Sequence, residues 1–160
     1  GFVVGLACAL LVVPLLPRLN PGEPLDAVLV AEHVRALQLG PLAEVVSSDR
    51  HTVKPWFQGR LDYAPPVFDL AAEGFPLIGG RTLHARGNVV ATLAYLRSRH
   101  VIDVFVWPST APQAPVHSVR RGFNVLHWAD GSMQYWAVSD LERSEMERFT
   151  QLWQQRVAAQ

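Results

Sequence analysis

The N-terminal segment, residues 1–17, constrains the architecture of this chain more than any other feature. It contains no charged side chain, no side-chain amide and no hydroxyl, and the first charged residue is Arg18. A helix needs about 20 apolar residues to cross a bilayer, with about 17 as the lower limit. We therefore expect a membrane-spanning segment over residues 1–17. Since Gly1 follows neither an initiator methionine nor a basic stretch, we also expect further residues before it.

Three other interpretations of residues 1–17 are a cleavable signal peptide, a lipoprotein signal and a buried helix. A cleavable signal peptide has basic residues before its apolar stretch and small residues at its cleavage site, and both flanks differ here. A lipoprotein signal ending at Cys8 conflicts with the apolar residues that continue beyond it. A buried helix of a water-soluble protein conflicts with Pro14 and Pro17, because each proline removes a backbone donor and ends a helix.

The remainder of the chain is a linker, residues 18–24, and a stretch long enough for one domain, residues 25–160. Lysine plus arginine and aspartate plus glutamate number 14 each, so no net charge attracts nucleic acid. We therefore expect no direct contact with nucleic acid. Cys8 is the single cysteine, so residues 25–160 can form neither a disulfide nor a thiolate metal site.

The pattern of residues 25–39 predicts an amphipathic helix that ends at Gly40-Pro41. Its expected core-facing residues are Ala27, Val30, Ala31, Val34 and Leu37. Residues 42–46 read as a short strand. Residues 47–69 are rich in proline, aromatic and turn-forming residues, which predicts a structured loop with at most one helical turn.

From Phe75 onward the pattern favours β-structure. Strands are expected at residues 79–86, 89–96, 101–107, 123–128 and 133–138. Asp130-Gly131 between the last two is a strong hairpin signal, and Gly87-Asn88 marks another turn. Residues 108–115 are expected to form a surface loop. These strands, with residues 42–46, predict a mostly antiparallel sheet of five or six strands.

A C-terminal helix follows. Ser139 and Glu142 have the spacing of a capping box, in which each side chain bonds a free backbone N–H of the other residue. Its apolar stripe, spaced by three, four and four residues, is Met146, Phe149, Trp153 and Val157. The predicted fold class is α+β, with an N-terminal and a C-terminal helix packed on the sheet.

Motifs for catalysis are not found in the sequence. No nucleophile elbow, zinc-protease motif, phosphate-binding loop or dinucleotide fingerprint occurs. The six histidines have no metal-ligand spacing, and each is expected to be a surface or hydrogen-bonded residue. Asp49 with His51 is interpreted as a turn cap. We therefore expect a protein that is not an enzyme, with no metal site and no cofactor.

Residues 47–69 nevertheless contain a possible binding surface, because large aromatic rings lie beside cations there. Such groups bind partners through cation–π contacts and rigid apolar anchors. The alternative is that Trp56 and Phe57 only cover the end of the sheet. The candidate ligand or partner residues are His51, Lys54, Trp56, Phe57, Arg60 and Tyr63.

The same region carries a family resemblance. The strings DRHTVKPWFQGRLDYAPPVFDLAAEGFPLIGGR, HVIDVFVWP, GFNVLHW and YWAVSDL, within residues 44–141, resemble the extracytoplasmic region of proteobacterial transmembrane anti-sigma factors. Members of this family have a cytoplasmic sigma-binding segment, one membrane helix and a periplasmic domain. The order of segments in this chain is similar to the last two parts.

The resemblance implies a single-pass protein of the bacterial inner membrane, with its C-terminal domain in the periplasm. It also implies an extracytoplasmic-function sigma factor as partner, bound by a cytoplasmic segment that residues 1–160 do not contain. Residues 25–160 would then sense an unknown periplasmic signal or protein. The alternative function is a membrane-anchored periplasmic binding or chaperone-like domain, with an aromatic groove around Trp56, Phe57 and Tyr63.

Overall fold

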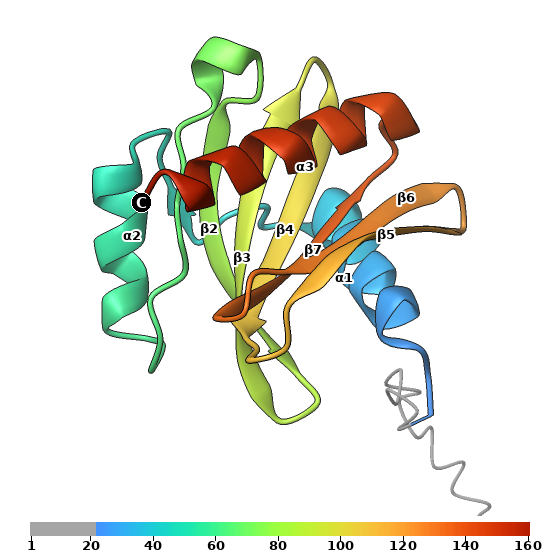
Figure 1. Cartoon of the computed structure of the whole chain (residues 1–160), viewed down its shortest axis with the longest axis horizontal. Coiled ribbons are helices and arrows are strands. Elements are labelled where there is room, and N and C mark those ends of the chain that lie inside the picture. The colour runs from blue at the N-terminus through green and yellow to red at the C-terminus, as the bar shows by residue number, and fades with distance from the viewer. Residues whose placement is uncertain (1–21) are drawn as a thin grey trace, which may run out of the picture.

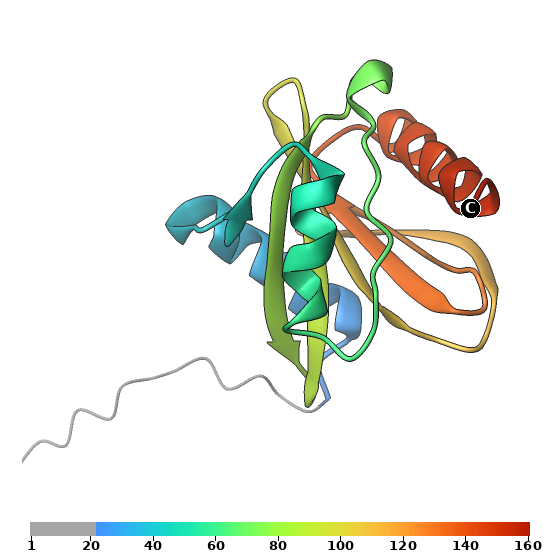
Figure 2. The same cartoon turned by 90° about the vertical axis from the view of Figure 1, so that its left-hand side faces the viewer.

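The computed structural model describes residues 22–160, which form a seven-stranded antiparallel sheet with helices on both faces (Figures 1 and 2). The helices are α1 (Leu25–Leu39), α2 (Arg50–Gln58) and α3 (Arg143–Ala158), with a short 3-10 turn at Ala71–Glu73. The strands are β1 (Val45–Val46), β2 (Leu77–Ala85), β3 (Asn88–Arg97), β4 (His100–Pro108), β5 (Gln113–Arg120), β6 (Phe123–Ala129) and β7 (Met133–Ser139). The predicted α+β class is confirmed.

The strand order is β1-β2-β3-β4-β7-β6-β5. Strands that are neighbours in sequence pair with each other except β4 and β5, and β1 and β2 do so although α2 lies between them. After β4 the chain passes to the far edge of the sheet and returns through β6 and β7. The predicted Asp130-Gly131 hairpin is confirmed, with Ala129 opposite Gln134. Because of this order, β1 and β5 form the two edges.

The predicted strand count was too low by one, because β5 was not recognised. It begins at Gln113, inside the stretch expected to be a loop, and most of its side chains are exposed. An edge strand without a buried face shows no alternation of apolar and polar residues. At the other edge, β1 is only Val45–Val46, shorter than the expected strand over residues 42–46.

Helix α2 corrects the expectation of a loop over residues 47–69. Asp49 caps it by accepting a hydrogen bond from the backbone N–H of His51 at 2.8 Å, as the turn-cap interpretation of this pair suggested. Pro55 lies inside the helix and removes one backbone hydrogen bond. Burial of Val53 and Phe57 on one side of the helix compensates for this loss.

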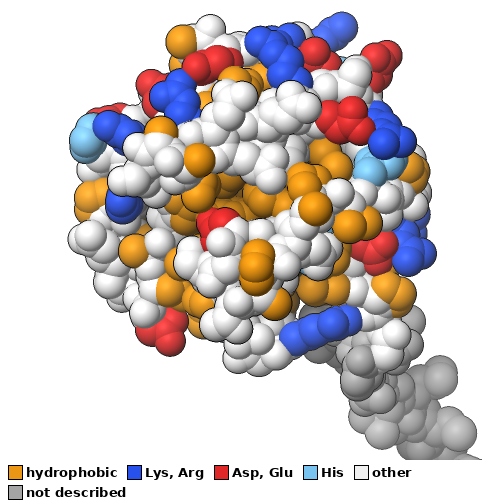
Figure 3. Space-filling model, viewed as in Figure 1, with side chains coloured by type: hydrophobic (Ala, Val, Ile, Leu, Met, Phe, Trp, Pro, Cys, Tyr) orange, Lys and Arg blue, Asp and Glu red, His pale blue; other side chains and the backbone are white. Residues whose placement is uncertain are grey.

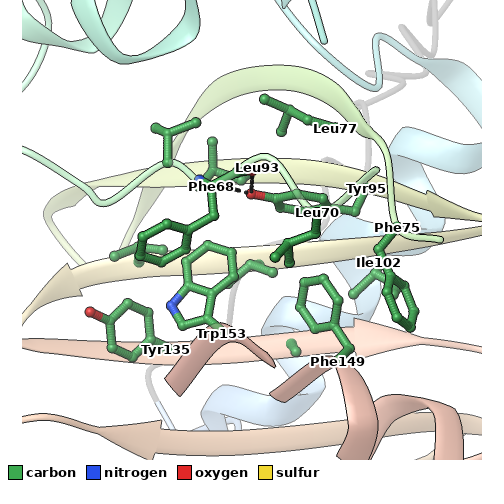
Figure 4. Close-up of a cluster of buried hydrophobic side chains, with 14 of the residues drawn as sticks. Phe68, Leu70, Phe75, Leu77, Leu93, Tyr95, Ile102, Tyr135, Phe149 and Trp153 are labelled. Carbon is green, nitrogen blue, oxygen red and sulfur yellow. Dashed lines mark hydrogen bonds between the residues drawn. The ribbon is translucent and has the colours of Figure 1, made fainter. Parts of the chain in front are cut away.

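The main core lies between the sheet and the layer formed by α2, residues 61–77 and α3. Trp153 of α3 packs edge-on against Phe68 and Tyr95, at centroid distances of 5.0 and 5.8 Å (Figure 4). The Tyr95 hydroxyl donates to the Phe68 carbonyl at 2.8 Å, which joins the irregular segment to β3. The predicted stripe on α3 is confirmed at Met146, Phe149 and Trp153, which are buried.

The start of α3 differs from the predicted capping box. The helix begins at Arg143, and no side chain caps it. The buried hydroxyl of Ser139 instead donates to the carbonyl of Val101 at 2.7 Å and accepts from the backbone N–H of Leu141 at 3.2 Å. Ser139 therefore ends β7 rather than starting the helix.

Helix α1 covers the opposite face of the sheet, and its predicted bounds are confirmed. The prediction of its buried face was wrong, because Ala31 and Leu37 are exposed and only Val30 of the expected residues is buried. The helix is rotated so that His33 faces the sheet. Its buried residues are Val28, Leu29, Val30, His33 and Ala36.

The packing of α2 on β2 generates a prediction. A Cβ at Gly80 would lie 2.7 Å from Cζ of Phe57 and 3.1 Å from Val53, so Gly80→Ala is expected to destabilise the domain by about 1–3 kcal/mol. Urea unfolding of the full chain, followed by tryptophan fluorescence, measures this change.

Gly59→Ala is the matched control, because a Cβ there meets no atom within 4 Å and the backbone φ is −90°. In a Phe57→Leu background, Gly80→Ala should cost less, since the ring that it meets has been removed. An equal cost in both backgrounds would contradict the proposed clash.

Candidate functional site

The six candidate surface residues lie on α2 and the loop after it, but they do not form one surface. His51 and Lys54 are exposed, whereas Phe57 is fully buried in the main core. The ring of Phe57 lies edge-on to that of Trp56, with centroids 5.1 Å apart. Phe57 is thus a packing residue of the main core, and Trp56 is half-buried beside it.

Arg60 closes the C-terminal end of α2. Its guanidinium carbon lies 4.1 Å from the centroid of the Trp56 ring, and its Nη1 donates to the Trp56 carbonyl at 2.8 Å. A cation–π contact between two of the candidate residues is therefore present within α2 and its end. It orients Arg60 while leaving it exposed.

Tyr63 joins two strands at the point where they separate. The ladder between β3 and β4 extends to Ala91 opposite Val106, and beyond this pair β4 continues beside β7. The Tyr63 hydroxyl lies 2.9 Å from the carbonyl oxygens of Val89 and Val106, to which it can donate, and it accepts from the N–H of Ala91 at 2.9 Å. Burial raises the pKa of Tyr63 to about 12. The hydrogen bond from Ala91 opposes this rise in pKa, and the charge of Asp62 adds to it.

A hollow of about 500 Å³ lies beside Tyr63 at this separation of the strands. It brings Arg60 and Tyr63 together with the β2–β3 turn and the end of β4, but it includes neither Trp56 nor Phe57. Its lining is Arg60, Leu61, Asp62, Tyr63, Gly87, Asn88, Val89, Trp107 and Pro108. Mixed charges, an amide and two aromatic rings make it suited to binding a polar group rather than a purely apolar one.

Three stacked rings were missed by the sequence analysis. His127 of β6 stacks on Trp136 of β7 with centroids 3.8 Å apart, and Trp107 of β4 lies parallel to Trp136 at 6.5 Å. All three are half-buried on the sheet face that carries α1. Burial lowers the pKa of His127, partly offset by its contact with Gln134. The sequence signal for this stack was the Asp130-Gly131 hairpin, because its register places His127 opposite Trp136.

A third feature is a hollow at the C-terminal end of α3, on the face where hydrophobic side chains gather below the helix (Figure 3). It has a volume of about 320 Å³, and Trp128, Tyr135 and Val157 contribute to its walls. The Tyr135 hydroxyl donates to Asp130 at 2.6 Å. Burial would raise the pKa of Asp130, but the hydrogen bonds from Tyr135, Met133 and Ser132 lower it below its usual range.

The strongest electrostatic feature is buried between α1 and the sheet. We name the His33–Asp103–Arg81 cluster the polar latch. Arg81 of β2 binds Asp103 of β4 through two hydrogen bonds of 2.7 and 2.9 Å, and its Nη1 also donates to the Leu42 carbonyl at 2.7 Å. Nδ1 of His33 lies 2.7 Å from Asp103, and the His33 and Asp103 side chains are fully buried.

The polar latch stabilises the charged form of Asp103. Burial alone would raise the pKa of Asp103, but the hydrogen bonds from His33 and Arg81, with their charges, lower it below its usual range. A carboxylate only accepts hydrogen bonds, so Nδ1 of His33 carries the proton. Nε2 of His33 has no hydrogen-bond partner among residues 22–160, and the His33 ring lies edge-on to that of Phe123, with centroids 5.3 Å apart.

Comparisons with known proteins found no match, whether among family models, curated proteins or solved structures. Within residues 22–160, no group of three or more histidine, cysteine, aspartate or glutamate side chains is arranged to hold a metal ion. None of the helices in the described part of the chain is long and apolar enough to cross a membrane. The predicted span over residues 1–17 lies outside the described residues.

The polar latch predicts a pH-dependent stability. Asp103→Asn should lower the free energy of unfolding by about 3–5 kcal/mol at neutral pH, because it leaves Arg81 buried without its counter-charge. The folded pKa of Asp103 lies below the unfolded value of about 3.9. Its contribution is therefore complete above about pH 4 and is lost as the pH falls below that value.

Urea unfolding of the full chain at a series of pH values measures both effects. Asp103→Asn should show a shallower loss of stability below about pH 4 than the unsubstituted protein. Asp62→Asn is the control, since Asp62 is exposed and makes no ion pair in the described structure. Parallel pH profiles for the unsubstituted protein and Asp103→Asn would contradict the role assigned to the latch.

Proposed function

We propose that this chain is the periplasmic sensory portion of a membrane-bound anti-sigma factor. Residues 1–17 would cross the inner membrane, residues 18–24 would link this span to the domain, and the domain would receive a periplasmic signal. It would act by binding and conformational change, without catalysis. The family resemblance of residues 44–141 supports this assignment, as does the order of apolar segment, linker and domain.

The observation that carries the proposal is the way α1 is attached. This helix begins directly after the linker, and it is held on the sheet by a small apolar core and by the polar latch. Separating α1 from the sheet would break the His33–Asp103 bond and expose Leu29 and Val30 to water. Buried polar contacts of this kind are either all made or lost, which favours two distinct states of the helix.

Two such states provide a route for regulation. A periplasmic ligand or protein that binds one state better than the other shifts their populations, and its effect is limited to that difference in affinity. In the docked state, α1 would hold the span in the position in which the cytoplasmic segment retains its sigma factor. In the undocked state, that segment would release it.

A specific observation also favours a second candidate, a membrane-anchored binding or chaperone-like domain. The hollow lined by Arg60, Tyr63 and Trp107 is open and mixed in character, as a site for a ligand or peptide would be. Phe57 does not contribute to it, so the groove would differ from the one expected around Trp56, Phe57 and Tyr63. This candidate requires no sigma factor.

Co-purification of the complete natural polypeptide from bacterial membranes tests the leading proposal. We expect an extracytoplasmic-function sigma factor to be retained with the protein. Asp103→Asn, which weakens the docking of α1, should retain less of it and raise transcription from a promoter that depends on this sigma factor. Glu142→Gln, at an exposed residue outside the hollow that makes no ion pair in the described structure, should behave as the unsubstituted protein does. Absence of any sigma factor under all growth conditions would sink the proposal and leave the second candidate.

A further inference from the structure

One end of the domain gathers three segments that are far apart in the sequence. The start of α1, the β2–β3 turn and the loop after α2 all lie there, whereas the β3–β4 turn lies at the opposite end (Figures 1 and 2). Arg86 in the β2–β3 turn donates to the carbonyl of Glu23, just before α1. We name this the proximal end, because the chain enters the domain there.

The surface of the proximal end is amphipathic. Trp107 is half-buried, and Pro108 beside it is exposed. Two hollows meet at Trp107 and Asn88, one toward Arg60 and Tyr63 and a smaller one, of about 200 Å³, toward Leu25 and Arg86. The exposed cations Arg60 and Arg86 flank this region, with Asp62 as the acid that faces the larger hollow.

This combination of side chains suits one environment in particular. Tryptophan has a large apolar ring with a single polar N–H, and it is enriched where a bilayer meets water. Arginine places its methylene groups on apolar surface while its guanidinium contacts phosphate oxygens. A half-exposed indole between two exposed guanidinium groups therefore matches the lipid headgroup layer.

The geometry of the chain limits how far the proximal end can be from a bilayer. The linker of residues 18–24 has seven residues and spans at most about 25 Å when fully extended. The headgroup layer of one leaflet occupies about 5–8 Å of that distance. If residues 1–17 cross the membrane, the proximal end is held close to the headgroups, whereas the β3–β4 turn is held away from them.

We propose that the proximal end of the domain lies against the lipid headgroup layer, with Trp107 at the interface and Arg60 and Arg86 beside lipid phosphates. The inference depends on the membrane attachment in the proposed function and extends it by assigning the surface that faces the bilayer. Contact at this end orients α1 relative to the membrane. A second copy of the chain at the same surface is the competing occupant.

Fluorescence quenching in vesicles tests this orientation. Single cysteines are introduced by Asn88→Cys at the proximal end and by Arg99→Cys in the β3–β4 turn, each in the full chain with Cys8→Ser. Asn88 and Arg99 are both exposed, so each accepts an environment-sensitive fluorophore. The labelled proteins are reconstituted into phosphatidylethanolamine–phosphatidylglycerol vesicles that contain lipids with a nitroxide on the headgroup.

We expect quenching at position 88 to exceed that at position 99 several-fold. A Trp107→Ala and Arg86→Ser double variant should reduce quenching at position 88 toward the level at position 99, because both interfacial contacts are removed. Urea unfolding of the double variant checks that the domain still folds. If it does not, Arg86→Ser alone is used, since Arg86 is exposed.

The outcomes separate this inference from the proposed function. Equal quenching at both positions, with the protein retained in the vesicles after an alkaline wash, would overturn the orientation and leave membrane attachment intact. Release of the protein by the wash would overturn the attachment and, with it, both proposals. If the signal at position 88 changes with protein concentration and not with nitroxide content, a second copy of the chain shields this position. That result would overturn the lipid contact.

Discussion

Asp103 accepts hydrogen bonds through both carboxylate oxygens, from Arg81 on β2 and His33 on α1, in a site closed to water. A buried carboxylate is tolerated only when its charge and its lone pairs are both satisfied. The backbone carbonyl of Leu42 is part of the same arrangement, because Arg81 donates to it. Asp103 can therefore make all these contacts only when three conditions hold together. The strands β2, β3 and β4 must have the correct register, α1 must have the correct rotation, and the chain before β1 must follow the correct path. We interpret the polar latch as a device that specifies one docking position for α1.

The two faces of the sheet depend on this latch to different degrees. The main core joins α2, residues 61–77 and α3 to the sheet through large aromatic and aliphatic side chains, and α1 takes no part in it. The smaller core under α1 includes Leu29, Val30 and Phe105. Since apolar burial contributes in proportion to area, α1 is held by less apolar contact than the rest of the domain. Local opening is expected where few apolar contacts hold an element, so we expect α1 to separate from the sheet more readily than the main core unfolds.

Local patterns in the sequence predicted most of the elements, and long-range contacts account for what they missed. The Asp130-Gly131 turn, the apolar runs of β3 and β4 and the stripe on α3 are short-range signals, and each was confirmed. Helix α2 was missed because the turn-forming, proline and aromatic residues of the segment 47–69 show no sustained period, whereas burial of Val53 and Phe57 outweighs the hydrogen bond lost at Pro55. The hollow combines Arg60 and Tyr63, which are close in sequence, with Trp107 and Asn88, which come near them only through the sheet. Local patterns could not predict the polar latch, because it joins residues up to 70 positions apart in the sequence, as in the His33–Asp103 bond.

The position of the latch along α1 connects the two proposals. His33 lies eight residues after Leu25, which is about 12 Å along the helix axis and a little over two turns. A helix is stiff over that distance, so a displacement at Leu25 moves His33 with it instead of being absorbed between them. The proximal end, where Arg86 contacts Glu23, is where a membrane or a ligand would apply such a displacement. A movement of one or two ångströms is enough to break a hydrogen bond of 2.7 Å, and Asp103 has no second donor on α1 to replace His33 in the described structure. Under the proposed function, the latch would convert a small shift at the proximal end into a change between docked and undocked α1.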